Sequence, residues 1–203
     1  MAEFDSASLR TELRQRRQGL SETQQQLHAD QACQHFFDAN LLDTNTNKRY
    51  KVAAFLSQDG ELNTSTLIQR LWRLNSVELY LPALETQPDW HMGFSRYTPD
   101  SALINNRFGI PEPDVPRNQH LNGKDMDLVI MPLVGYDLKG HRLGMGGGYY
   151  DRTFAFKLKS ATAEHSPTLI GWAHSCQQVS QLPSEPWDVP LDGLINETGF
   201  IRF

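Results

Sequence analysis

The first part of the chain contains two segments with the apolar spacing of helices. Leu9 and Leu13 mark one apolar edge of a helix predicted over residues 6–18. Gly19 follows this segment and can end it in a left-handed cap. A serine followed three residues later by a glutamine then forms a capping box, which predicts a second helix over residues 21–37. The chain is therefore expected to begin with a pair of helices.

The rest of the chain alternates short apolar runs with amphipathic segments. The runs predict strands and the amphipathic segments predict helices, because the two structures repeat with different periods. Strands are predicted at residues 50–56, 77–81, 92–97, 127–134 and 168–173, and helices at residues 64–74 and 149–159. Pro82 is expected to stop the second strand, and the Pro-rich residues 106–116 are expected to be irregular. Residues 182–191 predict a loop and residues 195–203 a short hairpin.

This alternation of strands and helices predicts an α/β fold with mostly parallel pairing and right-handed crossovers. No repeat, low-complexity segment or linker divides the sequence, so residues 1–203 are expected to form one domain. Ligands in such sheets bind beyond the carboxyl ends of the strands. Two loops follow predicted strands, at residues 57–64 and residues 142–152, and both are expected to face the same rim of the sheet.

Composition narrows the functional classes. Hydrophobic residues make up 39% of the chain and charged residues 21%, which is typical of a soluble globular protein. The net charge of −5 argues against nucleic acid as the main partner. The sequence contains no membrane-length apolar run and no apolar signal core, and its two cysteines are far apart. We therefore expect a monomeric cytoplasmic protein with small-molecule partners.

The most informative segment is a glycine-rich loop between a predicted strand and a predicted helix. We call it the glycine loop, and it comprises Arg142, Leu143, Gly144, Met145, Gly146, Gly147, Gly148, Tyr149, Tyr150, Asp151 and Arg152. Glycines let several backbone N–H groups approach one ligand, and N–H groups at the start of a helix suit a phosphate. The arginines add cationic donors, the tyrosines offer flat faces to a ring, and Asp151 offers a hard oxygen to Mg²⁺.

Simpler interpretations of the glycine loop exist. A glycine-rich turn between a strand and a helix is only a tight connection about as often as it is a binding loop. No Gly-Lys-Ser/Thr follows, which excludes a Walker A motif, and no acidic residue ends a second strand about 20 residues later, as a dinucleotide fingerprint requires. The combination of glycines with two arginines, two tyrosines and an aspartate favours a functional loop.

The loop over residues 57–64 is the second candidate. Its Asp-Gly pair signals a turn, and Asn63 or Thr64 can cap the helix that follows. On these residues alone, an ordinary strand-to-helix loop is the more common structure. The functional alternative is that Glu61, held at the rim, accepts hydrogen bonds from a heterocycle rich in N–H groups.

Charged residues elsewhere could join these loops. Arg10, Arg14 and Arg17 share one face of the first helix by their spacing. Such a face is most often solvated, and the alternative is that it turns toward a triphosphate. Asp188 lies in a Pro-rich segment, where it is either a turn residue or a second Mg²⁺ carboxylate beside Asp151.

Other chemistries find little support in the sequence. Its seven histidines include no H-x-x-x-H pair, so a zinc site is not expected. No G-x-S-x-G nucleophile elbow occurs. Cys33 and Cys176 are expected to be packing residues.

Taken together, these motifs resemble the 5-formyltetrahydrofolate cyclo-ligase (5,10-methenyltetrahydrofolate synthetase) family over about residues 8–192. The glycine loop with its two tyrosines is specific to that family. The supporting motifs occur in the family's order and spacing, and they are Ser8-Leu9-Arg10, Phe55-Leu56-Ser57 with Glu61 and Thr64, Phe108-Gly109-Ile110-Pro111-Glu112-Pro113, Asp127-Leu128-Val129-Ile130-Met131-Pro132, and Trp187-Asp188.

The resemblance implies a three-layer α/β/α sandwich and an ATP- and Mg²⁺-dependent enzyme. 5-Formyltetrahydrofolate would become 5,10-methenyltetrahydrofolate through a phosphorylated formyl group, with release of ADP and phosphate. No protein nucleophile is expected. The residues that the resemblance assigns are Arg10, Arg14 and residues 142–150 for ATP, Leu56, Glu61 and residues 145–149 for the folate, and Asp151 and Asp188 for Mg²⁺.

One position departs from the family pattern. Members often carry a lysine four residues before the arginine of the first helix, and that position is Ser6 here. Arg14 or Arg17 could take over the lysine's contact with the nucleotide. The central position of the glycine loop, basic in some members, is Gly147 here, as in the bacterial form.

Two other functional classes stay open at this point. A sugar-phosphate isomerase or an acyl-CoA-type transferase on a similar sheet would use Glu61 as its base or nucleophile. A non-catalytic folate- or nucleotide-binding regulator would have no need for a metal at Asp151 and Asp188.

Overall fold

The computed structural model describes residues 5–43, 47–84, 91–159 and 166–203. Its helices are α1 (Ser6–Gln18), α2 (Glu22–Asp38), α3 (Ser65–Trp72), α4 (Tyr149–Phe154) and α5 (Phe156–Lys159), with short 3-10 turns η1 (Arg117–Gln119), η2 (Gly123–Asp125) and η3 (Ser175–Gln177). Its strands are β1 (Tyr50–Ala53), β2 (Val77–Leu84), β3 (Met92–Arg96), β4 (Leu103–Asn105), β5 (Pro111–Pro113), β6 (Leu128–Pro132), β7 (Gly135–Tyr136), β8 (Arg142–Leu143), β9 (Thr168–Trp172), β10 (Gly193–Asn196) and β11 (Gly199–Arg202). No helix within these described ranges has the length and hydropathy needed to cross a membrane.

The central sheet has seven strands in the order β11-β10-β9-β6-β1-β2-β3. The five inner strands run parallel to one another, and the two edge strands, β3 and β11, pair antiparallel with them. The predicted mostly parallel sheet is therefore confirmed. The predicted C-terminal hairpin is also confirmed, and it supplies the edge strand β11.

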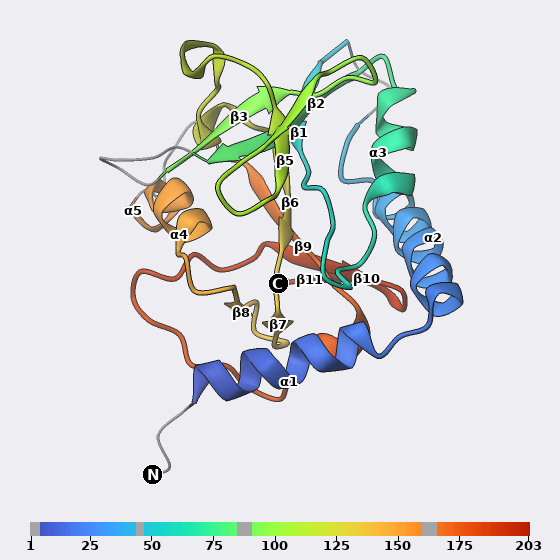
Figure 1. Cartoon of the computed structure of the whole chain (residues 1–203), viewed down its shortest axis with the longest axis vertical. Helices are drawn as coiled ribbons and strands as arrows, with labels where there is room; N and C mark the ends of the chain where they lie inside the picture. Colours follow the sequence, from blue (N-terminus) through green and yellow to red (C-terminus); the bar gives the residue numbers. More distant parts are fainter. Residues whose placement is uncertain (1–4, 44–46, 85–90, 160–165) are drawn as a thin grey trace.

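Helices cover both faces of this sheet, which gives the expected three layers (Figure 1). One core joins α2 and α3 to one face of the sheet, and a second core joins α4 and α5 to the other. Val52 and Ala53 are consecutive residues of β1, and they fall in different cores because successive side chains of a strand point to opposite faces. Apolar residues thus fill both faces of the parallel strands, as their continuous apolar runs predict.

Several boundaries differ from the expected ones. β2 does not stop at Pro82, which pairs with Phe94 of β3 inside the strand. This is possible because the pairing of β2 with β1 ends at Tyr80, so Pro82 has a neighbouring strand on one side only. Gly19 ends α1 with a right-handed φ of −75° and not with a left-handed cap.

Two further segments also differ. The segment expected to be irregular contains β5, which forms a small antiparallel ribbon with β4. The helix predicted over residues 149–159 is divided at Ala155 into α4 and α5. The capping box before α2 is present as predicted, with Ser21 and Gln24 bonded to each other's backbone N–H groups.

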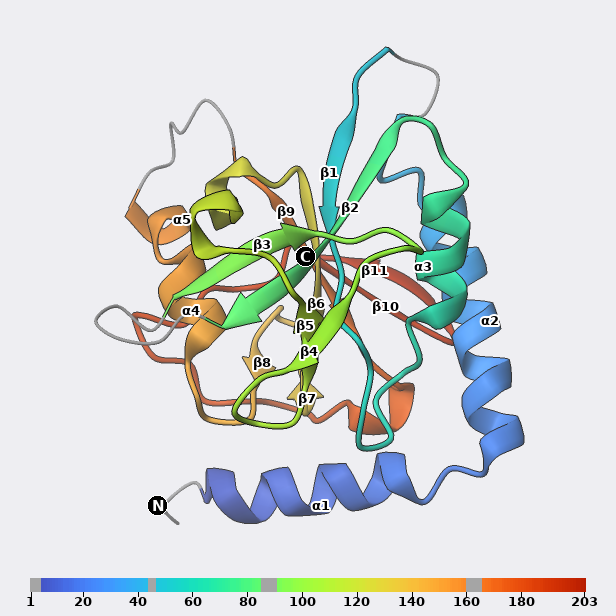
Figure 2. The same ribbon diagram turned by 45° about the horizontal axis from the view of Figure 1, so that its top comes forward.

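α1 occupies a separate position across one end of the sheet, as both views show (Figure 1, Figure 2). It lies at the end where β6 finishes, and its Leu13 is fully buried against Val134, Leu143 and Leu182. The expected N-terminal helical pair is thus present, but its two members have different tasks. α2 covers a face of the sheet, and α1 covers the carboxyl ends of the strands, where ligands bind in such folds.

Candidate active site

α1 connects the two predicted loops at this end of the sheet. Arg10 Nε donates a hydrogen bond to the carbonyl oxygen of Gly144 at 2.7 Å, and Arg14 Nε donates to Asp59 Oδ2 at 2.7 Å. The loop of Asp59 directly follows β1, whereas the glycine loop follows β6 only after the short β7–β8 ribbon. Both loops therefore meet at one rim as predicted, although the glycine loop does not leave the main sheet directly.

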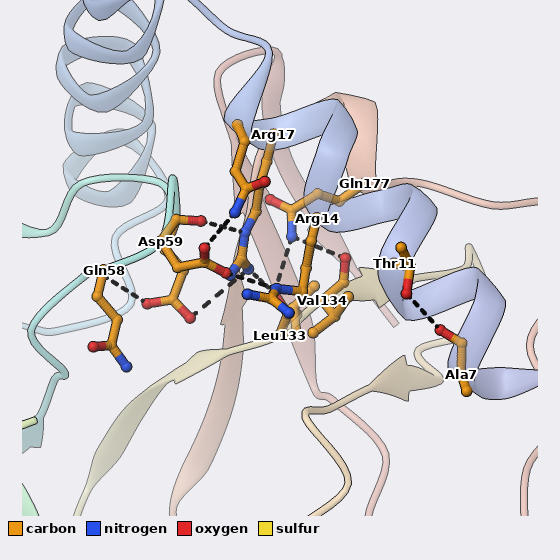
Figure 3. A network of polar contacts seen from close by, with 11 residues as sticks. Ala7, Thr11, Arg14, Arg17, Gln58, Asp59, Leu133, Val134 and Gln177 are labelled. Carbon is orange, nitrogen blue, oxygen red and sulfur yellow. Dashed lines mark hydrogen bonds and ion pairs between the residues drawn. The ribbon is translucent and has the colours of Figure 1, made fainter. Parts of the chain in front are cut away.

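Arg17 is the buried centre of this arrangement. Its side chain is 1% exposed, and it pairs with the Asp59 carboxylate at 2.9 Å. Its guanidinium also donates to the backbone carbonyls of Asp59, at 2.9 Å, and Leu133, at 3.3 Å. Figure 3 shows Arg14 and Arg17 extending from α1 toward Asp59. The arginine face of α1 is thus turned toward the rim, and the expectation of a solvated face is wrong for Arg17.

Asp59 anchors the loop after β1. The hydrogen bond from Arg14, with further bonds from Arg17 and Gln18, lowers the pKa of Asp59 to about 2. Its backbone is left-handed, with φ of 54°, and the adjacent Gly60 has φ of 71°. Asp tolerates this conformation better than most residues and Gly adopts it freely. Charge pairing and turn geometry therefore fix the loop that carries Glu61.

Glu61 is a largely buried carboxylate. Its side chain is 13% exposed, its Oε2 accepts from the backbone N–H of Gln58 at 3.0 Å, and Arg17 Nη1 lies 3.8 Å from its Oε1. Burial raises the pKa of Glu61, against the hydrogen bond from Gln58 and the charge of Arg17. The pKa of Tyr150 is also raised, first by burial and then by the negative charge of Glu61. The charge of Glu61 therefore acts on Tyr150 across the two loops.

Left-handed glycines shape the glycine loop. Gly146 has φ of 94° and Gly148 has φ of 63°. A Cβ on Gly148 would lie 2.8 Å from Nη1 of Arg152, which donates to the carbonyl oxygen of Gly147 through Nη2 at 2.7 Å. Gly147 itself has no left-handed φ, and an added Cβ there would lie 3.1 Å from the ring of Tyr149. Positions 146 and 148 therefore require glycine because of their left-handed backbone conformation. Position 147 requires glycine only because a side chain there would approach the ring of Tyr149.

The members of the glycine loop are not equally accessible. The segment from Gly144 to Gly147 is exposed, and the Met145 side chain extends into solvent. Leu143 instead packs against Leu13 of α1, so its side chain is structural. Tyr150 stacks on Phe154 in the core, with ring centroids 6.3 Å apart. The exposed backbone of the loop is consequently the part that can meet a ligand.

Arg107 is a cation near this loop that the sequence interpretation missed. It lies in the turn between β4 and β5, and it donates a hydrogen bond to the hydroxyl of Tyr149. The adjacent Phe108 is exposed, and the Arg107 guanidinium lies 4.7 Å from the centroid of its ring. No fixed spacing in the sequence connects this turn to the glycine loop. Only the fold brings the two together.

Arg142 is bound within the protein. Its Nη2 lies 2.6 Å from Asp151 Oδ1, and its Nη1 donates to the Val189 carbonyl at 2.8 Å. The backbone N–H of Val189 also donates to Asp151 Oδ1, at 3.1 Å. These bonds bring the segment that contains Asp188 next to the start of α4. Arg142 therefore positions Asp151, and both of its terminal nitrogens already have partners in the protein.

The two proposed metal carboxylates offer oxygen donors of the kind that Mg²⁺ prefers. Asp188 Oδ2 accepts from the backbone N–H of Glu185 at 2.8 Å, which fits the turn role, one of the two alternatives for this residue. Asp151 uses Oδ1 for its bonds to Arg142 and Val189. Within the described ranges, the other oxygen of each carboxylate makes no hydrogen bond. The residues therefore fit a Mg²⁺ ion that shares its coordination with phosphate oxygens and water.

A shallow polar hollow lies at the opposite end of the strands, where β1 and β6 begin. It is lined by Lys48, Arg49, Lys51, Lys124, Asp125 and Asp127. Lys48 forms an ion pair with Asp127 there, with Lys48 Nζ 2.7 Å from Asp127 Oδ1. Because ligands in parallel sheets bind at the carboxyl ends of the strands, this hollow is not the candidate active site.

Comparisons with known proteins cover nearly the whole chain. The family model of the 5-formyltetrahydrofolate cyclo-ligase family matches residues 3–197. The 5-formyltetrahydrofolate cyclo-ligase of Haemophilus influenzae is 41% identical over 184 residues, covering 90% of this chain and 92% of that protein. The enzyme of the same name from Escherichia coli K12 is 40% identical over 184 residues, covering 90% and 95%.

A solved structure agrees with these relatives. The NMR structure of Aquifex aeolicus 5,10-methenyltetrahydrofolate synthetase matches with a TM-score of 0.73 and 28% identity, over 97% of this chain and 92% of that chain. The shared fold, the match over residues 3–197 and the identity to enzymes of one name lead to one conclusion. The chain belongs to the 5-formyltetrahydrofolate cyclo-ligase family.

Proposed function

We propose that this protein converts 5-formyltetrahydrofolate into 5,10-methenyltetrahydrofolate in a reaction that requires ATP and Mg²⁺ and releases ADP and phosphate. The names of its relatives support the folate substrate. One structural observation supports the two-substrate site most strongly. α1 ties the glycine loop, through Arg10, to the loop of Glu61, through Arg14, so that a phosphate site and a heterocycle site share one rim.

The folate would bind beside Glu61. The reduced pterin ring presents several N–H donors, and a carboxylate can accept two of them in a bidentate, charge-assisted arrangement. Glu61 is mostly buried, so that such bonds would form away from competing water. Leu56 is partly exposed at the end of the β1 segment and would contact the ring, and the backbone of residues 145–149 would close the site.

ATP would bind along the exposed backbone of the glycine loop. N–H groups there can approach phosphate oxygens because Gly146 and Gly148 adopt left-handed conformations. Arg10 reaches the loop, and Ser6, at the position of the family's lysine, accepts a hydrogen bond from Arg10 Nη1 at 2.9 Å. Arg14 is bound to Asp59, so we propose that Arg10 is the α1 residue that meets the nucleotide.

Mg²⁺ would bind between Asp151, Asp188 and the phosphates of ATP. Bound Mg²⁺ would neutralise the charge that develops during phosphoryl transfer. Asp151 is already paired with Arg142, which reduces the negative charge available for a cation. Arg142 would keep Asp151 in position, and the phosphates of ATP would supply the remaining negative charge that a bound cation needs.

The proposed reaction has two steps. The formyl oxygen attacks the γ-phosphorus of ATP and ADP leaves. N10 of the same folate then attacks the activated formyl carbon and loses its proton, and phosphate leaves with the former formyl oxygen. The second attack is intramolecular, so orientation lowers its barrier and no protein nucleophile is required. The protein's own residues bind, orient and exclude water.

The direct test is to incubate the purified protein with 5-formyltetrahydrofolate, ATP and Mg²⁺. We expect methenyl absorbance to appear in a fixed ratio to released ADP, and no product when ATP or Mg²⁺ is omitted. Product formed without ATP, or ATP hydrolysis without product, would contradict the proposal.

A further inference from the structure

A cluster of three metal-ligand side chains lies outside the candidate active site. His28 is on α2, His174 follows β9, and Glu197 is in the turn between β10 and β11. Figure 1 shows β10 and β11 beside α2, which brings these distant segments together. One ligand atom from each residue lies within 4.8 Å of the other two. Neither ATP binding nor folate binding, as proposed above, uses any of these side chains.

The distances in this cluster suit a small tetrahedral cation. His28 Nδ1 is 3.0 Å from His174 Nδ1 and 3.6 Å from Glu197 Oε1. Two ligands of a tetrahedral zinc ion, each about 2.0–2.1 Å from the metal, lie roughly 3.3 Å apart. The two imidazole rings are tilted by 55° and not stacked, so they converge through their Nδ1 atoms. Small movements of these side chains would place all three donors around one ion.

Hydrogen bonds from Ser175 hold Glu197 in place. The backbone N–H of Ser175 donates to both carboxylate oxygens of Glu197, at 3.2 and 3.0 Å, and its hydroxyl donates to Oε1. His174 Nε2 is buried and makes no hydrogen bond within the described residues, so only Nδ1 of this ring faces His28. A proton on Nε2 leaves the lone pair on Nδ1, as metal binding requires.

We propose that His28, His174 and Glu197 form a binding site for a divalent transition-metal ion of the zinc type. Two imidazole nitrogens and one carboxylate favour zinc or cobalt over Mg²⁺, which prefers oxygen ligands. The fourth position is left for water. His28 is 18% exposed and gives the ion a path from solvent. A bound ion would join α2 to β9 and to the C-terminal hairpin, next to the loop of Gly60.

The test is to titrate chelator-treated full-length protein with Co²⁺ in excess Mg²⁺, so that carboxylate sites are already occupied. We expect one equivalent to bind with the visible absorption of tetrahedral Co²⁺, and Zn²⁺ to displace it and raise the temperature of unfolding. His28→Ala and Glu197→Gln should weaken binding at least about tenfold. His91→Ala, at an exposed histidine, should not change it.

Two results would overturn the proposal. One is a wild-type protein that shows no tetrahedral Co²⁺ spectrum. The other is equal Co²⁺ affinity in wild type, His28→Ala and Glu197→Gln, which would locate the ion elsewhere. Circular dichroism without metal identifies a variant that fails to fold. Glu197→Gln preserves the shape of the side chain, so it keeps the test available if His28→Ala is unstable.

Discussion

Replacing Asp59 by Asn tests whether the ion pairs of α1 hold the rim together. The substitution keeps the size of the side chain and removes its charge. Asn also tolerates the left-handed backbone that Asp59 adopts, with φ of 54°, so that the turn itself is preserved. The change therefore isolates the interaction of the carboxylate with Arg14 and Arg17.

The pKa of Asp59 gives the expected magnitude. A decrease from 3.8 to about 2 corresponds to about 2 kcal/mol of stability at neutral pH. Arg14 is 40% exposed and solvent screens its share, so we expect a loss of about 1–2 kcal/mol in Asp59→Asn at pH 7. Because the folded-state pKa is depressed, this stability is present above pH ~4 and is lost as the pH falls toward ~2. Roughly half should be lost by pH ~3.

Urea unfolding of both proteins at pH 7, 4 and 3 measures this difference. Asp100→Asn, at an exposed aspartate, is the matched control and should unfold like the wild type at each pH. We expect the gap between wild type and Asp59→Asn to narrow as the pH falls. A gap below about 0.5 kcal/mol at pH 7, or one that does not change with pH, would refute the reasoning.

Three further predictions concern the candidate active site. Gly148→Ala should raise the KM for ATP about tenfold in steady-state kinetics, because it strains a φ of 63° and brings a Cβ within 2.8 Å of Arg152. The control is Gly199→Ala, at an open position with φ of 152°. An equal rise in the KM for ATP in both variants would indicate general strain. Asp151→Asn should lose turnover that added Mg²⁺ partly restores, while calorimetry still detects folate binding. Full activity of this variant at limiting Mg²⁺ would show that Asp151 has only a structural role. Glu61→Gln should weaken 5-formyltetrahydrofolate binding about 10- to 150-fold without changing ATP binding, since a charged hydrogen bond contributes about 1.5–3 kcal/mol. A loss of kcat alone in Glu61→Gln would instead indicate a general base.

Local signals in the sequence predicted local structure well. The capping box at Ser21 predicted the start of α2 because both of its hydrogen bonds lie within four residues. The apolar runs predicted the parallel strands because buried strands need apolar residues on both faces. The prediction that Pro82 stops the second strand was wrong. Whether a strand tolerates a proline depends here on where β1 stops pairing with β2, which is a property of the sheet and not of the proline.

The candidate site was predictable only in part for the same reason. The glycine loop is contiguous, so its residues could be recognised together. The spacing of Arg10, Arg14 and Arg17 predicted that they share a face, but not that Arg17 is buried against Leu133, a residue 116 positions away. The contact of Arg107 with Tyr149 likewise depends on long-range packing.

The histidine cluster lies furthest from what sequence spacing could predict. The absence of an H-x-x-x-H pair predicts that the chain has no zinc site. It does not exclude ligands contributed by α2, the end of β9 and the C-terminal hairpin, which span positions 28 to 197. Such a group becomes visible only when the parallel sheet brings these segments together.

The position of α1 has a consequence for how the protein is made. α1 is synthesised well before its partners: Arg17 contacts Leu133, and Arg16 Nη1 donates to the carbonyl oxygen of Cys176, 160 residues later. With few contacts to α2, this helix has no completed surface to pack on until most of the sheet has been synthesised. We therefore expect α1 to dock late in folding, and its docking joins the two loops of the site. A nascent or truncated chain that ends before η3 would contain the whole glycine loop and still lack the contacts of α1 with η3 and Leu182.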